Sequence, residues 1–247
     1  MAKEGERDYL AAIGEAGRCH AFNKPFSNHD CGLTLASIGA VMNLMPPPPA
    51  RVLDLGCGSG WTSAFFARHG YDVVGQDIAP DMIALAEDVK RHHHQGDNLR
   101  FVLSDYEGLD MPDSFDCAVF FDCLHHAEDE GSAIGSVFRA LKPGGILITH
   151  EPGEGHSTTP ASIEAMERYG VNERDMPPQL IISRATQAGF VSPRIFPMQH
   201  ELLHLFYQNN LPHIFSLAGL RMARRVLRLL FNPNVRGSAI VVLRKPG

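Results

Sequence analysis

A glycine-rich turn between a short apolar strand and a helix constrains this chain more than any other feature of its sequence. The stretch from Val52 to Leu55 is apolar at all but one position, as expected for a strand that is covered on both faces of a sheet. Three glycines follow at every second position: Gly56, Gly58 and Gly60. A strand, such a turn and a helix together present backbone N–H groups to a ligand at the helix N-terminus. We therefore expect a ligand-binding turn in an α/β fold.

The spacing of the turn indicates the kind of ligand. A dinucleotide-binding turn has the pattern G-x-G-x-x-G, but here its third glycine would fall at Trp61. The pattern present is Asp54-x-Gly56-x-Gly58-x-Gly60, with a carboxylate that would repel a pyrophosphate and suit a ligand with an ammonium group. This pattern resembles the first motif of the class I S-adenosylmethionine-dependent methyltransferases, D/E-x-G-x-G-x-G. The alternative is that the glycines only shape a tight turn.

Composition limits the class of protein. The 247 residues, 44% of them hydrophobic, suffice for one α/β domain with insertions or for two small domains. The sequence contains no apolar run of the roughly 18 residues that a membrane-spanning helix needs. Residues 1–8 are largely charged and show no secretory segment, and the five cysteines form no C-x-x-C pair. These features are typical of a cytoplasmic protein with free thiols.

Charge is unevenly distributed along the chain. The net charge of −6 argues against general nucleic-acid binding. Residues 202–247 contain seven Arg or Lys and no acid, which leaves −13 for the residues before them. Four arginines have helical spacing: Arg221, Arg224, Arg225 and Arg228. We expect either a solvated basic face or contact with an anionic acceptor or a membrane surface, with Arg224 and Arg225 as candidate acceptor contacts.

Acidic residues follow three further predicted strands. Asp77 ends the second strand 21 residues after Gly56, where an acidic residue accepts hydrogen bonds from ribose hydroxyls. The alternative is that Asp77 caps the next helix. The family resemblance implies that Asp105 binds the adenine amino group and that Tyr106 covers the ring. Asp122 follows the fourth strand, in a sequence similar to the family's fourth motif in its small-molecule form and without the N-P-P-Y or D-P-P-Y of adenine-type amino methyltransferases.

The resemblance covers residues 50–150 and includes the turn Lys142–Gly145, which reads K-P-G-G as in the family. It implies S-adenosyl-L-methionine as cofactor and S-adenosyl-L-homocysteine as product. The predicted cofactor contacts are Asp54, Gly56, Gly58, Gly60, Asp77, Ile78, Met82, Asp105, Tyr106 and Asp122.

The implied fold is a Rossmann-like doubly wound α/β sheet of seven strands. The family's order is 3-2-1-4-5-7-6, with strand 7 antiparallel. Apolar periodicity predicts helices over residues 4–16 and 32–45, and the last two strands are expected near 191–196 and 238–243.

We expect two parts in the chain. Residues 1–49 form a helical N-terminal cap, and residues 50–247 form the methyltransferase domain. Inserts at about 151–176 and 199–236 interrupt the family pattern, and the second insert is predicted to hold one or two helices. Such loops usually carry specificity on a common scaffold, so we expect them to cover the acceptor site.

Histidines at the carboxyl edge of the predicted sheet are candidates for acid–base chemistry. Methyl transfer from a sulfonium requires alignment of the acceptor, and a hydroxyl acceptor also needs a base. His125 and His126 follow the fourth strand and are the predicted catalytic residues, with His125 preferred; the alternative is that they cap a helix or satisfy buried carbonyls. Further candidates for acceptor contacts are His150, Glu151 and His156.

No metal site is predicted. Residues 92–94 are consecutive histidines at the end of a helix, where they are suited to the helix dipole and to solvent. The histidines and glutamates of residues 150–156 lack zinc-like spacing.

The sequence thus predicts an S-adenosylmethionine-dependent methyltransferase for a small molecule or saccharide, with oxygen as the preferred acceptor atom. The alternative from another class is a non-catalytic cofactor-binding protein that regulates or scaffolds another enzyme. A nucleotide-dependent oxidoreductase is disfavoured by Trp61 and Asp54. No motif identifies the acceptor or the oligomeric state.

Overall fold

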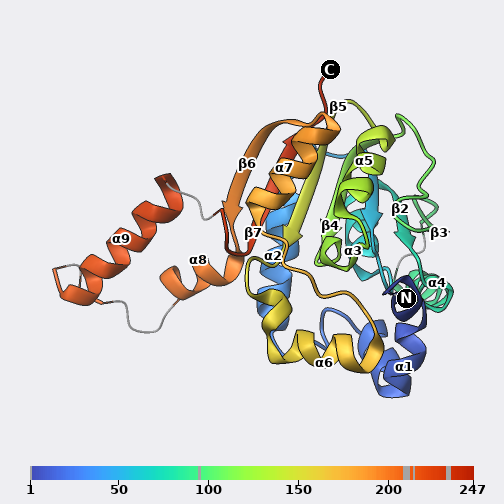
Figure 1. Ribbon diagram of the computed structural model, residues 1–247, viewed down its shortest axis with the longest axis horizontal. Coiled ribbons are helices and arrows are strands. Elements are labelled where there is room, and N and C mark those ends of the chain that lie inside the picture. The colour runs from blue at the N-terminus through green and yellow to red at the C-terminus, as the bar shows by residue number, and fades with distance from the viewer. Residues whose placement is uncertain (1, 94–95, 208–211, 214, 232–234) are drawn as a thin grey trace.

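A seven-stranded sheet forms the centre of the protein (Figure 1). The computed structural model describes residues 2–93, 96–207, 212–213, 215–231 and 235–247. The strand order is β3-β2-β1-β4-β5-β7-β6, and β7 runs antiparallel to both of its neighbours. The strands are β1 (Arg51–Leu55), β2 (Asp72–Asp77), β3 (Leu99–Leu103), β4 (Phe115–Phe121), β5 (Leu141–Glu151), β6 (Val191–Pro197) and β7 (Ala239–Arg244). The predicted order and the antiparallel strand are confirmed.

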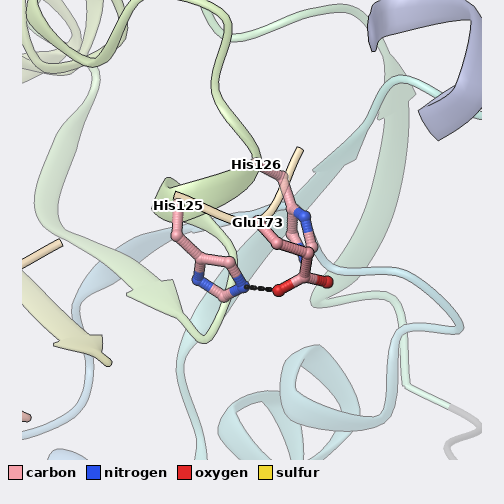
Figure 2. Close-up of side chains that lie close together, drawn as sticks. All are labelled: His125, His126 and Glu173. Atoms are coloured by element: carbon pink, nitrogen blue, oxygen red, sulfur yellow. Dashed lines mark ion pairs between the residues drawn. The ribbon is translucent and has the colours of Figure 1, made fainter. Parts of the chain in front are cut away.

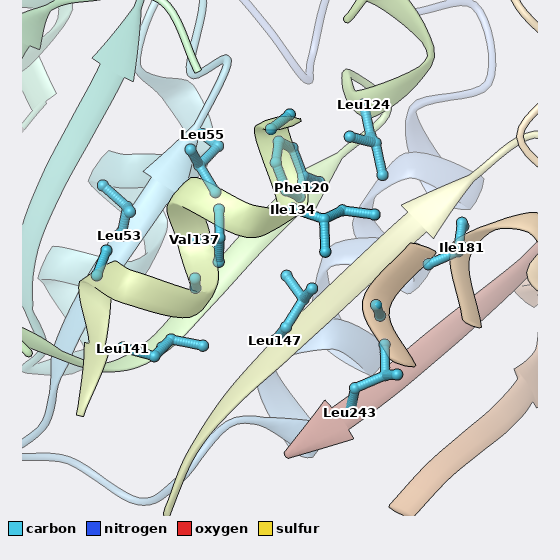
Figure 3. Close-up of a cluster of buried hydrophobic side chains, with 14 of the residues drawn as sticks. Leu53, Leu55, Phe120, Leu124, Ile134, Val137, Leu141, Leu147, Ile181 and Leu243 are labelled. Atoms are coloured by element: carbon cyan, nitrogen blue, oxygen red, sulfur yellow. The ribbon is translucent and has the colours of Figure 1, made fainter. Parts of the chain in front are cut away.

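Helices cover both faces of this sheet because its central strands are apolar on both sides. On one face, Leu53 and Leu55 pack into a cluster with α5 (Glu130–Ala140) and α7 (Pro178–Ala188), part of which is shown in Figure 3. On the other face, Val52 packs into a cluster that includes residues of α2 (Cys31–Leu44) and α3 (Trp61–His69). α4 (Pro80–His93) follows β2.

The carboxyl ends of the parallel strands meet at one edge, where ligands bind in open α/β sheets. The helices α1 (Ala2–Phe22) and α6 (Pro160–Tyr169) lie in this region (Figure 1), and two short 3-10 segments, η1 (Leu124–His126) and η2 (His156–Thr158), follow β4 and β5. α1 packs against both α4 and α6, so a segment from the start of the chain closes over this edge.

Some elements differ from the sequence-based expectations. α1 continues to Phe22 instead of ending near residue 16, and it is interrupted at Gly14, whose φ is 67° and ψ is −166°. α6 was not anticipated within the first insert. Its start is marked in the sequence by Thr159, whose Oγ1 accepts a hydrogen bond from the Ser162 N–H (3.1 Å), followed by a proline at the first helical position.

The insert before the last strand contains two helices, as expected. They are α8 (Gln199–Phe206) and α9 (Leu217–Phe231). Figure 1 shows α9 standing away from the sheet, beyond α8. Among the described residues, no helix is long and apolar enough to cross a membrane.

Candidate functional site

The glycine-rich turn between β1 and α3 presents backbone to open space. Gly56, Gly58 and Gly60 all have left-handed backbones, with φ of 57°, 52° and 74°. A Cβ atom on Gly58 would meet nothing within 4 Å, whereas one on Gly56 would lie 2.5 Å from the Tyr106 hydroxyl. The Gly58 N–H donates to the Asp77 Oδ2 (2.8 Å), which ties the turn to the end of β2. The turn therefore forms an open cradle of backbone, and side chains at the glycine positions would occupy it.

Asp54 lies beneath this turn. Its side chain is buried, and its Oδ2 accepts hydrogen bonds from Thr62 Oγ1 (2.6 Å) and Ser63 Oγ (2.5 Å) at the start of α3. Burial raises the pKa of Asp54 to about 6. Asp54 lines none of the described cavities, and neither does Gly60, which packs against Phe101. Both residues shape the turn from below.

The first of three cavities at this edge holds most of the predicted cofactor contacts. It is lined by Gly56, Gly58, Asp77, Ile78, Met82, Asp105, Tyr106 and Asp122, together with Lys3, Glu6 and Tyr9 of α1 and with His126. Burial raises the pKa of Asp77, whose two oxygens accept the N–H groups of Gly58 and Ala79 (2.8 and 2.9 Å). The fold therefore places eight of the ten residues that were predicted from the sequence as cofactor contacts around a single cavity.

Asp105 already has a partner in this cavity. Its Oδ2 accepts a hydrogen bond from Lys3 Nζ at 3.0 Å, and Lys3 also contacts Glu107 Oε2 at 2.9 Å. Burial opposes the charged carboxylate, but Lys3 and the Gly108 N–H lower the pKa of Asp105. Tyr106 is more enclosed, and its hydroxyl donates to the Cys123 carbonyl (3.2 Å).

The second cavity also borders the glycine-rich turn, and Gly56 and Gly58 line both cavities. It is lined by Gly56, Cys57, Gly58, Ser59 and Trp61 of the turn, by Ala21, Lys24, Asn28, Asp30 and Thr34 near the N-terminus, and by Met82, Phe121 and Asp122. Lys24 is the one lysine in this lining, and burial lowers the pKa of its amine. Sequence reasoning missed Lys24, because it lies in a loop far from every recognised motif.

The third cavity, of about 310 Å³, continues from the second along α2, β4, β5 and α8. Its lining includes Asp30, Leu33, Thr34, Ser37, Phe121, Asp122, His150, Pro152, His156, Met198, His200 and Ser238. His150 is 5% exposed and stacks on Phe121, with ring centroids 4.4 Å apart. Neither ring nitrogen of His150 has a hydrogen-bond partner among the described residues.

Asp122 joins the three cavities, since its side chain lines each of them. It directly follows β4 and has a φ of 53°, an uncommon value for a residue other than glycine. Its Oδ1 lies 3.6 Å from His150 Nδ1. Burial opposes both charges, but the ion pair lowers the pKa of Asp122 and raises that of His150. The two side chains form a charged pair at the junction.

Glu151 is buried at the end of β5 and organises the segment after β4. Its carboxylate accepts the N–H groups of Cys123 (3.1 Å), Leu124 (2.8 Å) and His125 (3.3 Å). It also accepts the Nδ1–H of His125 at 2.7 Å. Glu151 lines none of the described cavities, so its contacts are those of a supporting residue.

His125 is therefore held inside the protein. Its Nε2 lies 3.8 Å from Glu173 Oε2, as Figure 2 shows, and the same oxygen lies 2.6 Å from His156 Nε2. His125 is 5% exposed and lines none of the described cavities. Of the linked residues Glu151, His125, Glu173 and His156, it is His156 that lines the third cavity. Glu173 was not singled out from the sequence, which places it in a polar stretch without a motif.

His126 faces the first cavity and is surrounded by carboxylates. Its Nδ1 donates to the Asn172 carbonyl (2.6 Å) and lies 3.4 Å from Glu6 Oε1. Burial would lower its pKa, but Glu6 and Glu173 raise the pKa of His126 to about 9. At neutral pH the ring is a cation and has no free lone pair with which to accept a proton.

Three groups of this cluster are of the kind that binds metal ions. Donor atoms of His125, His126 and Glu173 lie within 4.8 Å of one another. Two ligands at about 2.1 Å from one zinc ion can be at most about 4.2 Å apart. Glu173 is already bonded to His156 (2.6 Å), so the arrangement fits a hydrogen-bonded network better than a preformed metal site.

Arg224 and Arg225 lie on α9 and are exposed. They line none of the described cavities. With α9 in this position, Arg224 and Arg225 do not reach the third cavity, where the predicted acceptor contacts His150 and His156 lie.

Comparison with known proteins agrees with this geometry. Residues 53–149 match the family model described as a methyltransferase domain. Within these residues the chain is similar to a methyltransferase domain. Over 112 residues it is 37% identical to the ubiquinone/menaquinone biosynthesis C-methyltransferase UbiE of Vibrio cholerae serotype O1, and the match covers 42% of each chain. The chain thus spans less than half the length of the curated relatives it matches.

Solved structures extend the likeness of the methyltransferase domain to most of the chain. A phosphoethanolamine N-methyltransferase 2 of Haemonchus contortus, in complex with phosphomonomethylethanolamine and S-adenosylhomocysteine, has a TM-score of 0.67 at 21% identity, covering 98% of this chain and 60% of that one. The [4+2]-cyclase SpnF has a TM-score of 0.59 at 22% identity, covering 87% and 82%. At these identities the likeness shows the shared fold.

Proposed function

We propose that this protein transfers a methyl group from S-adenosylmethionine to an oxygen of a small molecule or saccharide. The observation that carries the proposal is Asp122, which lines all three cavities. A cofactor that fills the first two cavities would end where the third begins. The acceptor would then meet its reactive end at the junction, as an in-line displacement requires.

The residues around the first two cavities fit the parts of the cofactor. Asp77 would accept hydrogen bonds from the ribose hydroxyls, while Ile78, Met82 and Tyr106 would enclose the adenine. Lys24, in the second cavity, offers a cation to the carboxylate of the cofactor's amino-acid end. When bound, the cofactor supplies an electrophilic methyl group on a positively charged sulfur.

The third cavity supplies a base from this chain. Among the described residues His150 Nε2 has no hydrogen-bond partner, and Nδ1 faces Asp122 Oδ1 at 3.6 Å, which orients the ring. Once the ring of His150 has lost its proton, it can accept a hydrogen bond from an acceptor hydroxyl in this cavity and then take the proton of that hydroxyl. The sequence favoured His125, but that ring is bonded to Glu151 (2.7 Å) and lines none of the described cavities, and His126 lines the first cavity and not the third. We therefore place the base at His150, with His156 beside it.

Two alternatives to methyl transfer onto oxygen have to be distinguished by experiment. The curated relatives are named as C-methyltransferases, and transfer to carbon would use the same cofactor cavities. The fold also occurs in a protein titled a cyclase, so a methyltransferase fold alone does not establish methyl transfer. A cofactor-binding protein without turnover is the corresponding alternative for this chain.

The experiment combines binding with transfer. Calorimetry measures affinity for S-adenosylmethionine, and methyl-labelled cofactor is then incubated with saccharides, phenols and quinols. We expect micromolar-range binding and label in a product whose new methyl is on oxygen. His150→Gln should abolish most transfer and leave affinity unchanged, with His92→Gln on the surface of α4 as control. Label on carbon or nitrogen would refute oxygen as the acceptor atom, and binding without any transfer would favour the non-catalytic alternative.

A further inference from the structure

The α9 helix has one basic face and one apolar face, and neither has been used by the proposed function. We propose that α9 is an anchor that lies in the plane of an anionic lipid bilayer. This proposal rests on the surface of α9 alone and does not require methyl transfer.

The basic face is made by four arginines at successive positions of one stripe: Arg221, Arg224, Arg225 and Arg228. At about 100° per residue they fall within roughly 100° of the helix circumference. All four are exposed, and the described residues show no ion pair to any of them. The chain carries no acid after Glu201, so this charge is not balanced locally.

The apolar face is large and incompletely covered. Leu220 and Leu227 are each 54% exposed, and Phe215, just before the helix, is 84% exposed. Met222 and Val226 are only half-buried. Monomeric proteins rarely leave apolar side chains of this size grouped in water, and such a group marks an interaction site.

An anionic bilayer is the occupant that suits both faces at once. A helix with a strongly basic polar face and an apolar face of leucine and phenylalanine lies at the lipid headgroups with its apolar side in the acyl region. Arginine can extend from that depth to the phosphates. A second copy of α9 would cover the leucines but contains no acidic residue to pair with the arginines. Figure 1 shows α9 beyond α8, away from the sheet, so a flat surface can approach it.

The test is co-sedimentation of the full chain with vesicles. Phosphatidylcholine vesicles with about 30% phosphatidylserine should bind the wild type, pure phosphatidylcholine vesicles should bind it weakly, and high salt should release it. Because each basic residue near such a surface strengthens binding about fivefold, the double variant Arg224→Gln and Arg225→Gln should bind about 25-fold more weakly. The matched control is Arg91→Gln with Arg100→Gln, two exposed arginines on α4 and β3, which should bind as the wild type does.

The apolar face needs its own variants. Leu220→Ser with Leu227→Ser should also reduce binding to the anionic vesicles. A Phe215→Trp variant should show a blue shift in tryptophan emission when these vesicles are added, which reports insertion. Unchanged cofactor affinity, measured without vesicles, verifies that each variant is folded.

Several results would overturn the proposal. They are equal binding to both vesicle types, binding that survives loss of the arginines and leucines, and no binding at all. A concentration-dependent dimer that disappears in the leucine variant would assign this face to a second copy of the chain instead.

Discussion

Replacing Asp77 tests the proposed cofactor site at a residue that both lines the first cavity and holds the glycine-rich turn. Its carboxylate ends β2, lines the first cavity and holds the N–H groups of Gly58 and Ala79 at 2.8 and 2.9 Å. Asp77→Asn preserves the size of the side chain and one accepting oxygen. It removes the negative charge that would accept bonds from the two ribose hydroxyls.

The magnitude follows from those contacts. Hydrogen bonds to a charged group contribute about 1.5–3 kcal/mol, so we expect the dissociation constant of S-adenosylmethionine to rise about 10- to 150-fold. The unfolding free energy of the free protein should fall by about 1 kcal/mol, because the amide nitrogen of Asn cannot accept the second of the two backbone N–H groups. Asp77→Ala should lose the same affinity and, in addition, about 1–3 kcal/mol of unfolding free energy, because two backbone N–H groups lose their acceptor.

Calorimetry of cofactor binding, with urea unfolding of each variant, measures both effects. Asp81→Asn is the matched control, because Asp81 accepts one N–H, that of Met82 (2.8 Å), yet lines none of the described cavities. A dissociation constant for Asp77→Asn within twofold of the wild type would refute the ribose role.

Three further predictions concern the turn, its support and the base. Gly58→Val places a side chain in the open cradle at a φ of 52°, so calorimetry should detect no cofactor binding although circular dichroism shows a folded domain; retained affinity would contradict the cradle. Because burial raises the pKa of Asp54 from 3.8 to about 6, its folded form binds the proton more tightly, and unfolding free energy should fall by about 2 kcal/mol as pH rises from about 4 to 7. Asp54→Asn should flatten this slope in urea titrations, and an unaltered slope would count against it. His150→Gln should lower turnover roughly 10²- to 10⁴-fold. The wild-type rate should rise with pH, because the pKa of His150 is raised and the ring must lose its proton before it can act as a base. A loss of cofactor affinity equal to the loss of rate would show that the residue is structural.

The sheet could be predicted from the sequence because its signals are local and repeated. Val52, Leu53 and Leu55 mark a strand covered on both faces, and the glycines after them fix the turn. The carboxyl ends of parallel strands share one edge, so the positions of Asp77 and Asp122 at two strand ends were enough to place them near each other.

The roles of individual side chains at that edge could not be predicted in the same way. Asp54 has the right position in the motif, yet its carboxylate is taken up by Thr62 and Ser63. His125 is less available as a base than His150 because Glu151 holds the ring of His125. Glu151 and His125 are 26 residues apart in the chain, so no local pattern indicates this pairing. A sequence pattern records which groups are available, whereas burial and the partner of each nitrogen are properties of the packed structure.

Gly14 divides α1 into two parts with different attachments. The later part is tied to the core region, where the Ser59 Oγ donates to the Ala21 carbonyl (2.7 Å). The earlier part carries Lys3, Glu6 and Tyr9 over the first cavity. It is held by polar contacts of Lys3 and Glu6 to Asp105, Glu107, His126 and Asn172, and also by the buried Leu10 and by Tyr9 against Tyr169.

Partly exposed ion pairs of this kind contribute about 1 kcal/mol or less each and weaken as salt screens them. Salt should therefore weaken the polar contacts of this first part of α1, whereas the packing of Leu10 and Tyr9 does not depend on charge. We therefore expect the residence time of a ligand in the first cavity, which Lys3 and Glu6 line, to shorten as ionic strength rises.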